Sequence, residues 1–574
     1  MESPTSTISP SYSFSPTLRQ PSTPRAPSTK FTLQPPKNSP KEISVKRAVR
    51  TVDNAHLLTA VQHEMTKVLD KYQVIRAISY ADIHQDAIHI RSQMFVKTKL
   101  DGRVTARLAA GGNDQPSDSF VDTYAATSDD SSKLLLIAAF HADAVHNNYL
   151  DELHMSDFDV PGAFLNIKLD KVSAPRQIIM RLPPDIPHPL AGKEVEVVGG
   201  LYGLKQSNHL FEQDIHPIFL SCGFTPLPSD SKVYIKRHPT SPRLKCAISM
   251  HVDDGLGIYT HRPYYNEIIA ALTNRYGPLT QNDICTSHTG ISLITHPTGA
   301  VSTSMQKYIT SMLHNIGMDH IPPASTPSDE SLFHAPTDTT PITQKFYQRV
   351  IGCLIHCLKI RADIRKEVTY LATRTSNPTA SDLEKAIRVL RYLKHSPTRG
   401  LTFYTTEGVR LYSHVDASYG TLPDGRSQTG FYCTIGRFSA PFFTKTGAQN
   451  SCVATGSMEA EYVALNALAK RILHFRFFLA DLGFEQTEPT IVLEDNQSAI
   501  NLAIAPQITR KSKHIHVRHH HIRDLVAQNI ISIKHLPTAE MTADLLTKPL
   551  GPTKFNFFCH RLLNSKHNLS LNHA

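Results

Sequence analysis

The sequence contains no apolar run of about eighteen residues, the length that a membrane-spanning helix needs, so we expect no membrane segment. It opens without a secretory signal and has no repeat at a solenoid period, so we expect neither a secreted protein nor a repeat array. None of its eight cysteines forms a Cys-x-x-Cys pair, and we interpret the thiols as reduced and intracellular. Cys353 and Cys357, one helical turn apart, could share a metal, but we favour two small residues packed on one helix face.

A chain of 574 residues is too long for one ordinary hydrophobic core, so we expect two or more domains. Its 40% hydrophobic and 19% charged residues are typical of globular proteins. The formal net charge of +10 favours a polyanionic partner, although many soluble proteins are modestly basic. Residues 1–54 are rich in Ser, Pro and Lys and predict a disordered basic segment, and residues 553–574 predict a polar tail.

Apolar periodicity predicts where helices and strands lie. One helix begins near His56, with Leu57, Val61, Met65 and Val68 on one face. Further helices are predicted over residues 133–140, 347–358 and 380–394, and strands over residues 94–97 and 247–252. From about residue 409 to 550 the pattern indicates the order strand, hairpin, helix, strand, helix, helix, strand, helix.

Two consecutive carboxylates, in His251-Val252-Asp253-Asp254, lie on a tight turn between two apolar runs. Like charges held close raise each other's pKa unless a cation neutralises them, and Mg²⁺ prefers such oxygen ligands. A plain β-hairpin turn would explain the tetrapeptide equally well. A second acidic segment favours the cation site: Asp159 lies in an apolar strand that runs on to Phe164.

These two segments resemble the Tyr-Val-Asp-Asp box and the Asp-Val to Ala-Phe-Leu signature of copia-type retrotransposon reverse transcriptases. Residues 201–207 (LYGLKQS) resemble the family's Tyr-Gly-Leu-Lys-Gln element, and residues 95–112 resemble its fingers segment. All four segments follow the family's order and spacing. The resemblance implies that Asp159 and Asp253 hold two metal ions roughly 3.5–4 Å apart, with Asp254 assisting.

The resemblance also assigns contacts to substrate. Phe164 would lie beneath the incoming sugar and reject a 2′-hydroxyl, although ordinary core packing is an alternative. Lys99 and Arg107 would contact the triphosphate, or would simply be surface charges. Lys205 and Gln206 would line the template and nucleotide pocket.

The second half of the chain presents four acids at predicted strand ends and in helix turns: Asp416, Glu461, Asp495 and Asp544. Their segments resemble the ribonuclease H arrangement in its copia-type version. Glu461 is assigned rather than Glu459, which would be a neighbour at the start of a helix capped by Ser457. The resemblance implies that the four carboxylates hold two Mg²⁺ ions, which orient water and stabilise the leaving 3′-oxygen.

A basic patch precedes Asp544 and contains Lys511, Lys513, His514, His516, Arg518 and His519 to His521. We interpret Lys513, His514 and Arg518 as phosphate contacts, with a solvated helix face as the alternative. A zinc site at His516 and His520 is less favoured because no cysteine lies nearby. His535 is a candidate proton shuttle.

Several positions depart from the family pattern. His251 stands where the box usually has Tyr, residues 207–209 (SNH) replace a small-Pro-Arg run, and Gly111 replaces a Lys. Pro161-Gly162 beside the first Asp is atypical, and the chain has no Trp. None of these changes removes a proposed metal ligand.

The resulting expectation is an α+β architecture. Residues 55–325 would form a right-hand polymerase with fingers, palm and thumb, residues 326–405 a helical connection, and residues 406–552 a ribonuclease H-like α/β domain. The implied partners are an RNA template, a DNA primer, an RNA–DNA hybrid and deoxynucleoside triphosphates, with Mg²⁺, or alternatively Mn²⁺, as cofactor. A homodimer, a capsid particle in the cytoplasm and a nuclear location stay open. The alternatives are a decayed nucleic-acid-binding relic, or an active ribonuclease H with a dead polymerase.

Overall fold

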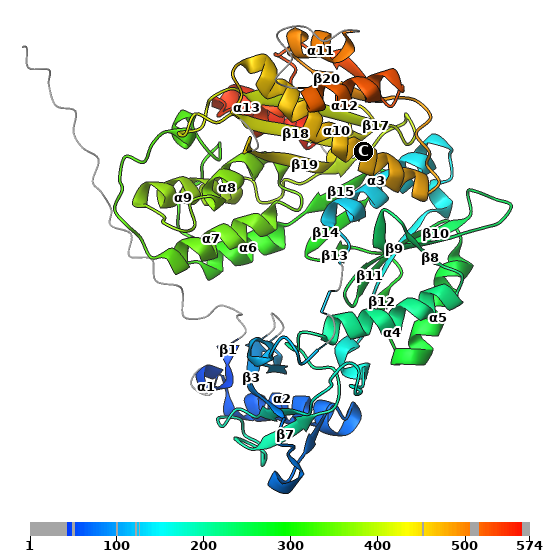
Figure 1. Ribbon diagram of the computed structural model, residues 1–574, viewed down its shortest axis with the longest axis vertical. Helices are drawn as coiled ribbons and strands as arrows, with labels where there is room; N and C mark the ends of the chain where they lie inside the picture. Colours follow the sequence, from blue (N-terminus) through cyan, green and yellow to red (C-terminus); the bar gives the residue numbers. More distant parts are fainter. Residues whose placement is uncertain are drawn as a thin grey trace, which may run out of the picture.

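The computed structural model describes residues 43–48, 52–98, 102–120, 123–124, 127–450, 453–505 and 516–564. Four β-sheets and the helices packed on them organise these residues, which confirms the predicted mixed α and β content (Figure 1). Within these ranges, no helix combines the length and the apolar character required to cross a membrane. The seven cysteines that fall in the described part of the chain all carry free thiols.

The first sheet forms a separate lobe, which we call the blue lobe because its N-terminal elements are blue in Figure 1, whereas β7 is green-cyan. Its strand order is β1-β3-β6-β7-β2, with β4 paired to β3. Its strands are β1 (Ile43–Ser44), β2 (Ile75–Ala77), β3 (Ile88–Thr98), β4 (Val104–Ala110), β6 (Ile178–Arg181) and β7 (Glu194–Val197). The predicted helix face is confirmed: Leu57, Val61 and Met65 of α2 (Asn54–Thr66) are buried against this sheet, and Val68 continues the face into the π-helical turn η1 (Lys67–Lys71).

The segment predicted to be disordered differs from the structure at its end. Residues 1–42 lie outside the described part of the chain, but residues 43–48 form β1 and the short helix α1 (Val45–Ala48). Ile43 pairs with Val96 on β3, and Val45 and Ala48 are buried. This piece is too short to show periodicity in the sequence, and it is ordered by the sheet edge that it joins.

The second sheet has the order β12-β5-β11-β10-β9-β8 and carries helices on both faces. Its strands are β5 (His154–Asp159), β8 (Thr225–Leu227), β9 (Asp230–Arg237), β10 (Lys245–His251), β11 (Asp254–Tyr259) and β12 (Thr280–Asn282). Alternate residues face opposite ways along a strand, so Phe158 packs against α4 (Ser207–Ser221) and α5 (Arg262–Tyr276), whereas Met155 faces α3 (Asp130–His146).

A small sheet, β13-β14-β15-β16, leads into a helical region. Its strands are β13 (Ser287–His288), β14 (Ile291–Thr295), β15 (Val301–Ser304) and β16 (Thr402–Phe403). The helices are α6 (Gln306–Asn315), α7 (Gln344–Cys357), α8 (Arg365–Ala372) and α9 (Ala380–His395), which confirms both helices predicted there. Cys357 is buried on α7, in agreement with the packing interpretation of its pair with Cys353.

The fourth sheet has the order β19-β18-β17-β20-β21. β17 (Leu411–Ser418), β18 (Gln428–Ile435) and β19 (Pro441–Ala448) are antiparallel, whereas β20 (Thr490–Glu494) and β21 (Ile531–His535) run parallel to β17. The helices are α10 (Ser457–Asp481), α11 (Gln497–Ile504), α12 (His516–Ala527) and α13 (Pro552–Leu562). The predicted element order is confirmed, but the N-cap of α10 is Gly456, so Ser457 is the first helical residue.

The predicted polar tail is wrong over residues 553–562, which belong to α13 (Pro552–Leu562). Phe555, Phe558, Cys559 and Leu562 are buried, and their spacing of three or four residues marks one apolar helix face. Polar residues around these positions concealed the periodicity. Residues 565–574 lie outside the described part of the chain.

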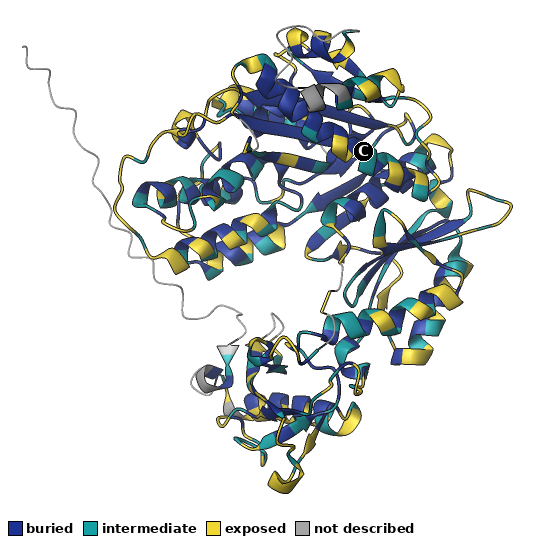
Figure 2. Cartoon of the chain, in the orientation of Figure 1, coloured by how far each residue is buried: buried dark blue, intermediate teal, exposed yellow. Residues whose placement is uncertain are grey.

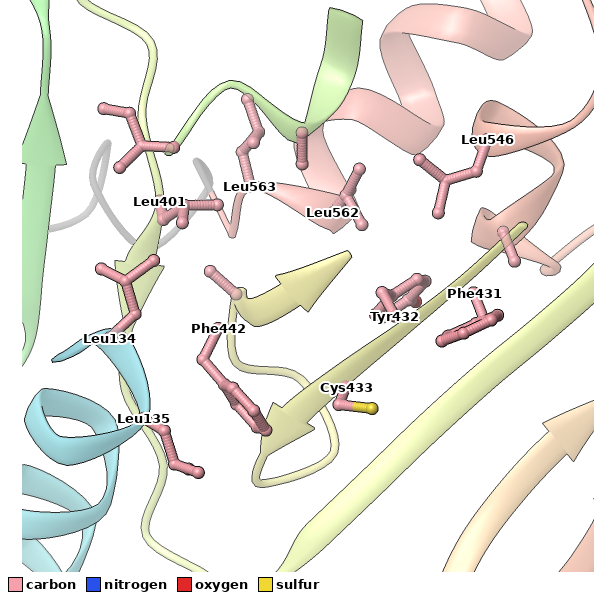
Figure 3. Packing of buried hydrophobic residues seen from close by; sticks show 14 of the residues in the cluster. Leu134, Leu135, Leu401, Phe431, Tyr432, Cys433, Phe442, Leu546, Leu562 and Leu563 are labelled. Atoms are coloured by element: carbon pink, nitrogen blue, oxygen red, sulfur yellow. The ribbon is translucent and has the colours of Figure 1, made fainter. Parts of the chain in front are cut away.

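One apolar core runs from the second sheet through α3 and the helical region into the fourth sheet. Figure 3 shows Leu134 and Leu135 of α3 beside Phe442 of β19, with Leu562 and Leu563 at the end of α13 in the same cluster. Every residue of β17 and β18 is buried, as the dark strands in Figure 2 show. Because both faces of these strands are buried, the fourth sheet packs against α3 and the helical region in one continuous core.

A buried ion pair anchors α13 to this body. Arg361 binds Asp363 through two hydrogen bonds of 2.9 and 2.8 Å, and both side chains are 0% exposed. The Tyr392 hydroxyl of α9 donates to the same carboxylate at 2.5 Å, and the Cys559 thiol of α13 lies 3.9 Å from it. The carboxylate thus joins three elements that are far apart in the chain.

Replacement of Asp363 by Ala should destabilise the protein by ~3–5 kcal/mol, because the Arg361 charge would stay buried without a partner. Urea unfolding followed by circular dichroism measures this change. Asp283→Ala is the control: it breaks an ion pair to Arg262 in which the side chains are 79% and 42% exposed, and it should cost at most ~1 kcal/mol. Equal losses in the two variants would contradict the assignment.

Candidate active sites

Three carboxylates meet at one edge of the second sheet. Asp159 ends β5, and the β10–β11 hairpin carries Asp253 and Asp254. β5 and β11 are antiparallel, and their register sets Asp254 opposite Asp159. The Val160 amide donates to the Asp253 carbonyl at 3.0 Å, which fixes the hairpin against β5. The structure therefore brings together all three acids predicted for the first site.

The hairpin turn itself is strained. Val252 has φ of 60°, a left-handed conformation that a β-branched residue rarely adopts. Such strain persists only where the surrounding structure holds it, and it is frequent at functional sites. Here it turns two successive carboxylates toward the end of β5.

Burial and mutual repulsion disfavour ionisation of the cluster. Burial raises the pKa of Asp159, and a hydrogen bond with Asp254 acts in the opposite direction. Burial, and then the charge of Asp159, raise the pKa of Asp253. Burial together with the charges of Asp253 and Asp159 raises the pKa of Asp254 to about 6. A cation among these oxygen atoms would relieve the repulsion.

Arg107 of β4, in the blue lobe, acts electrostatically on two acids of this cluster. Its guanidinium lies 4.3 Å from the centre of the Tyr202 ring, and Tyr202 packs edge-on against Phe164 at 5.4 Å. Arg107 lowers the pKa of both Asp159 and Asp253, against the larger effect of burial. The three predicted segments that contain Arg107, Tyr202 and Phe164 therefore lie together beside the carboxylate cluster.

Two glycines permit this convergence. The Ala110 amide donates to the Tyr202 carbonyl at 2.7 Å, and a Cβ on Gly203 would lie only 2.2 Å from the Ala110 oxygen. Gly162 has φ of 65°, and a Cβ there would lie 2.9 Å from the Tyr72 hydroxyl. The unusual Pro161-Gly162 pair therefore turns the chain after β5 ends and leaves the strand itself intact.

A basic pocket of about 850 Å³ opens beside Arg107, between α2 and the β3–β4 hairpin. Its lining includes the cationic or titratable side chains of His56, His63, Lys67, Lys97, Arg103 and Arg107. Of these, the sequence reasoning identified Arg107 alone, because the others lack a motif and come together only when α2 packs on the sheet. Lys99, the other predicted triphosphate contact, lies outside the described residues.

Lys205 and Gln206 pack against Gln115, a residue that the sequence reasoning missed. The Lys205 ammonium donates to the Gln115 carbonyl at 2.9 Å, and the Gln115 side-chain amide donates to Gln206 at 3.1 Å. Gln206 is 1% exposed. The hydrogen bond between Gln115 and Gln206 holds the loop before α4 in place. The role of Gln206 in lining the nucleotide pocket stays a prediction.

His251 lies half-buried below the hairpin, where its Nδ1 atom has no hydrogen-bond partner among the described residues. Burial, and then the charges of Lys133 and Lys359, lower its pKa. A neutral imidazole therefore fills the position at which the resembling family has a tyrosine.

The second cluster forms at the carboxyl ends of β17 and β20. These strands are parallel neighbours, so Asp416 on β17 and Asp495 after β20 emerge at the same edge, and α10 crosses the sheet to bring Glu461 to them. One oxygen atom from each of the three carboxylates lies within 4.8 Å of the others. Among the described residues, the three acids of the first site do not gather that closely as a group.

Glu494, next to Asp495, also belongs to this cluster and was missed as a site residue. It is 0% exposed, and its Oε2 atom and that of Glu461 have no hydrogen-bond partner in the described part of the chain. Burial, then repulsion by Glu494 and by Asp416, raises the pKa of Glu461 to about 11. Burial and the charge of Asp416 raise that of Glu494 to about 8. Two buried carboxylate oxygen atoms thus lack a hydrogen-bond donor among the described residues.

Asp544 joins the cluster through a lysine. The Lys548 ammonium donates to Asp416 at 2.9 Å and to Asp544 at 2.6 Å, and Lys554 donates to the other Asp544 oxygen at 2.6 Å. The structure therefore brings three of the four predicted acids within reach of one cation, and it pairs the fourth with two ammonium groups. Glu459 braces the start of α10 by accepting from the Thr455 amide at 2.7 Å, the neighbouring role predicted for it.

The remaining predicted residues lie near α12 and β21. His535 is exposed at the end of β21, opposite Glu494 in the sheet register. Lys511, Lys513 and His514 lie outside the described residues. Residues 516–520, which include Arg518, begin α12, and their side chains also lie outside that part.

Residues 85–330 match the family described as reverse transcriptase (RNA-dependent DNA polymerase). The chain is 26% identical to the retrovirus-related Pol polyprotein from transposon RE1 of Arabidopsis thaliana, over 80% of this chain and 30% of that protein. It is also 26% identical to the Pol polyprotein from transposon TNT 1-94 of Nicotiana tabacum, over 95% of this chain and 40% of that protein.

These matches confirm the resemblance to the reverse transcriptases of copia-type retrotransposon Pol polyproteins. The chain spans less than half the length of these two relatives. A foamy viral protease–reverse transcriptase, solved in complex with double-stranded DNA, aligns with a TM-score of 0.47 and 13% identity, over 84% of this chain and 70% of that one.

Asp254→Asn should raise the melting temperature of the metal-free protein at neutral pH. The pKa of Asp254 in the fold, about 6, exceeds its ordinary value of 3.8, so the stability that its carboxyl contributes is present at acid pH and is lost as pH rises through about 6. The advantage of the variant should therefore shrink toward pH 4. Thermal melts in EDTA across this pH range measure the effect.

Asp118→Asn, at a side chain that is 74% exposed, is the control and should change little. A lower melting temperature for Asp254→Asn than for the wild type at pH 7.5 would contradict the electrostatic account.

Proposed function

We propose that this chain synthesises DNA on RNA and DNA templates and degrades the RNA strand of the resulting hybrid. The observation that carries the first activity is the register that sets Asp254 opposite Asp159, with Asp253 on the same turn. The observation that carries the second is the buried group of Asp416, Glu461 and Asp495. The family match over residues 85–330 supports the polymerase assignment.

We assign one part of the proposed enzyme to each of the four sheets. The lobe of β1 to β4, β6 and β7 would act as fingers, and the second sheet, with α3 to α5, as the palm. The small sheet and α6 to α9 would form the thumb and connection. The sheet of β17 to β21, whose antiparallel and parallel halves meet at β17, would be the ribonuclease H-like domain, extended to Leu562 by α13.

The donor set of the first site fits a divalent metal. Asp159, Asp253 and Asp254 offer only carboxylate oxygen atoms, the ligands that Mg²⁺ prefers, and burial, followed for Asp253 and Asp254 by repulsion from neighbouring carboxylates, raises their pKa values. Asp159 and Asp253 would hold the metal, which when bound supplies Lewis-acid stabilisation of phosphoryl oxygen atoms. Asp254, hydrogen-bonded to Asp159, would orient that ligand.

The neighbouring groups suit a nucleotide. Arg107 would bind a phosphate through its planar fork while Tyr202 holds the guanidinium from one side. Phe164, half-buried against Tyr202 and Phe211, would form the wall that a sugar meets. The basic pocket beside Arg107 would accept phosphates of the template strand or the nucleotide.

The second site also fits a metal, because the unpartnered oxygen atoms of Glu461 and Glu494 are buried. Asp416, Glu461 and Asp495 would hold the metal, which when bound supplies an activated water for phosphodiester hydrolysis. His535, exposed at the same sheet edge, would move a proton to the leaving oxygen. We further propose that the protein works inside the cell, where its nucleic-acid substrates are found.

The wild-type protein should extend an oligo(dT) primer on poly(rA) with Mg²⁺, and Asp253→Asn should lower the rate by about a thousandfold, equivalent to ~4 kcal/mol of transition-state stabilisation. A gel-based extension assay measures both rates. The exposed Asp118→Asn variant is the matched control and should extend normally. If the folded wild type extends no primer, the polymerase half of the proposal fails, and hybrid cleavage then distinguishes a ribonuclease H with a dead polymerase from a nucleic-acid-binding relic.

Asp495→Asn should reduce cleavage of an RNA–DNA hybrid by about a thousandfold, because it removes one of three ligands from the second site. Primer extension should persist in the same preparation, since the first site is intact. Asp424→Asn, at a side chain that is 57% exposed in the β17–β18 turn, is the control. If the Asp495→Asn variant still cleaves the hybrid, the assignment of the second site is wrong. If the wild type cleaves the hybrid but extends no primer, the chain is a ribonuclease H alone.

A further inference from the structure

Lys548 lies inside the second site and no motif assigned it a role. It follows the short helix η9 (Thr542–Leu546), and its ammonium donates to Oδ1 of Asp416 and to Oδ1 of Asp544. The two carboxylates are 0% and 1% exposed, whereas the lysine side chain is 34% exposed. One ammonium group therefore bridges two buried acids that are distant in the sequence.

The bridge is held in place by further contacts. The Lys366 ammonium donates to the Lys548 carbonyl at 2.8 Å, which ties the segment to α8. The Thr547 hydroxyl donates to Oδ2 of Asp416, and Lys554 donates to Oδ2 of Asp544. All four oxygen atoms of Asp416 and Asp544 thus accept from a side-chain donor.

The two glutamates of the same cluster have fewer hydrogen-bond donors than Asp416 and Asp544. Glu461 and Glu494 each keep one buried oxygen atom that has no hydrogen-bond partner in the described part of the chain. The ammonium groups of the site therefore lie at Asp416 and Asp544, whereas the buried oxygen atoms without a donor belong to Glu461 and Glu494. A divalent cation placed among Asp416, Glu461 and Asp495 would contact three carboxylates, while Lys548 occupies the side between Asp416 and Asp544.

We infer that Lys548 is the built-in second cation of this centre, so that the site takes one divalent ion instead of the two expected from the four acids. The inference rests on the proposed ribonuclease H function and deepens it. Carboxylate oxygen atoms have two lone pairs each, so Asp416 can accept from Lys548 and still bind a metal. Lys548 is on this account a positioning residue: it orients Asp416 for the metal and keeps Asp544 occupied.

The test counts metal ions directly. Mn²⁺ binding is measured by electron paramagnetic resonance on the full chain with Asp159→Asn and Asp253→Asn, which silence the first site. This parent should bind one Mn²⁺ ion. Lys548→Met, which removes the ammonium and keeps the length of the side chain, should raise the count to two, and adding Asp544→Asn should return it to one.

Lys554→Met is the matched control, because Lys554 contacts Asp544 and not Asp416 among the described carboxylates, and the count should stay at one. Two ions in the parent would overturn the role of Lys548 while leaving the metal centre intact, and this readout stands even if Lys548→Met does not fold. A folded Lys548→Met protein that still binds one ion would also overturn it. A parent that binds none would contradict the proposed ribonuclease H centre itself.

Discussion

Repulsion between buried carboxylates is the constraint on which both sites depend. At the first site, β-strand register presses Asp159 against the hairpin that carries Asp253 and Asp254. At the second, parallel strands and a crossing helix gather Asp416, Glu461 and Asp495, with Glu494 behind them. Repulsion alone would separate such charges, so the surrounding packing holds the carboxylates together, and a bound cation would relieve the repulsion.

The packing that holds them is continuous. The apolar cluster around α3 includes residues of the second sheet, the helices α7 to α9 and the fourth sheet, so one continuous core supports both sites. The blue lobe has its own core and meets that body where the backbone of Tyr202 and Gly203 pairs with the end of β4. Arg107 thus belongs to the lobe, whereas the acids of the first site belong to the second sheet.

Motif spacing was sufficient to predict the acids of both sites, because strand ends and turns deliver them whatever the details of packing. Side chains that act through distant contacts were not predictable in this way. Lys548 and Asp416 are separated by 132 residues, and their contact depends on how η9 docks beneath β17. Glu494 was not predicted as a site residue because its neighbour Asp495 matched the motif. Only the burial of its side chain in the structure shows that Glu494 belongs to the cluster. The sequence contains the apolar residues of the buried face of α13, but the polar residues between them led to the prediction of a tail.

Calorimetry tests the central claim most directly. If buried carboxylates with raised pKa values are the metal ligands, binding of Mg²⁺ must expel their protons. Titration of the wild-type protein with Mg²⁺ near pH 7, in buffers that differ in ionisation enthalpy, should reveal a net release of protons, most of it from Glu461 and Glu494, whose pKa values are about 11 and about 8. Binding of Mg²⁺ with a heat that is the same in every buffer would contradict the account.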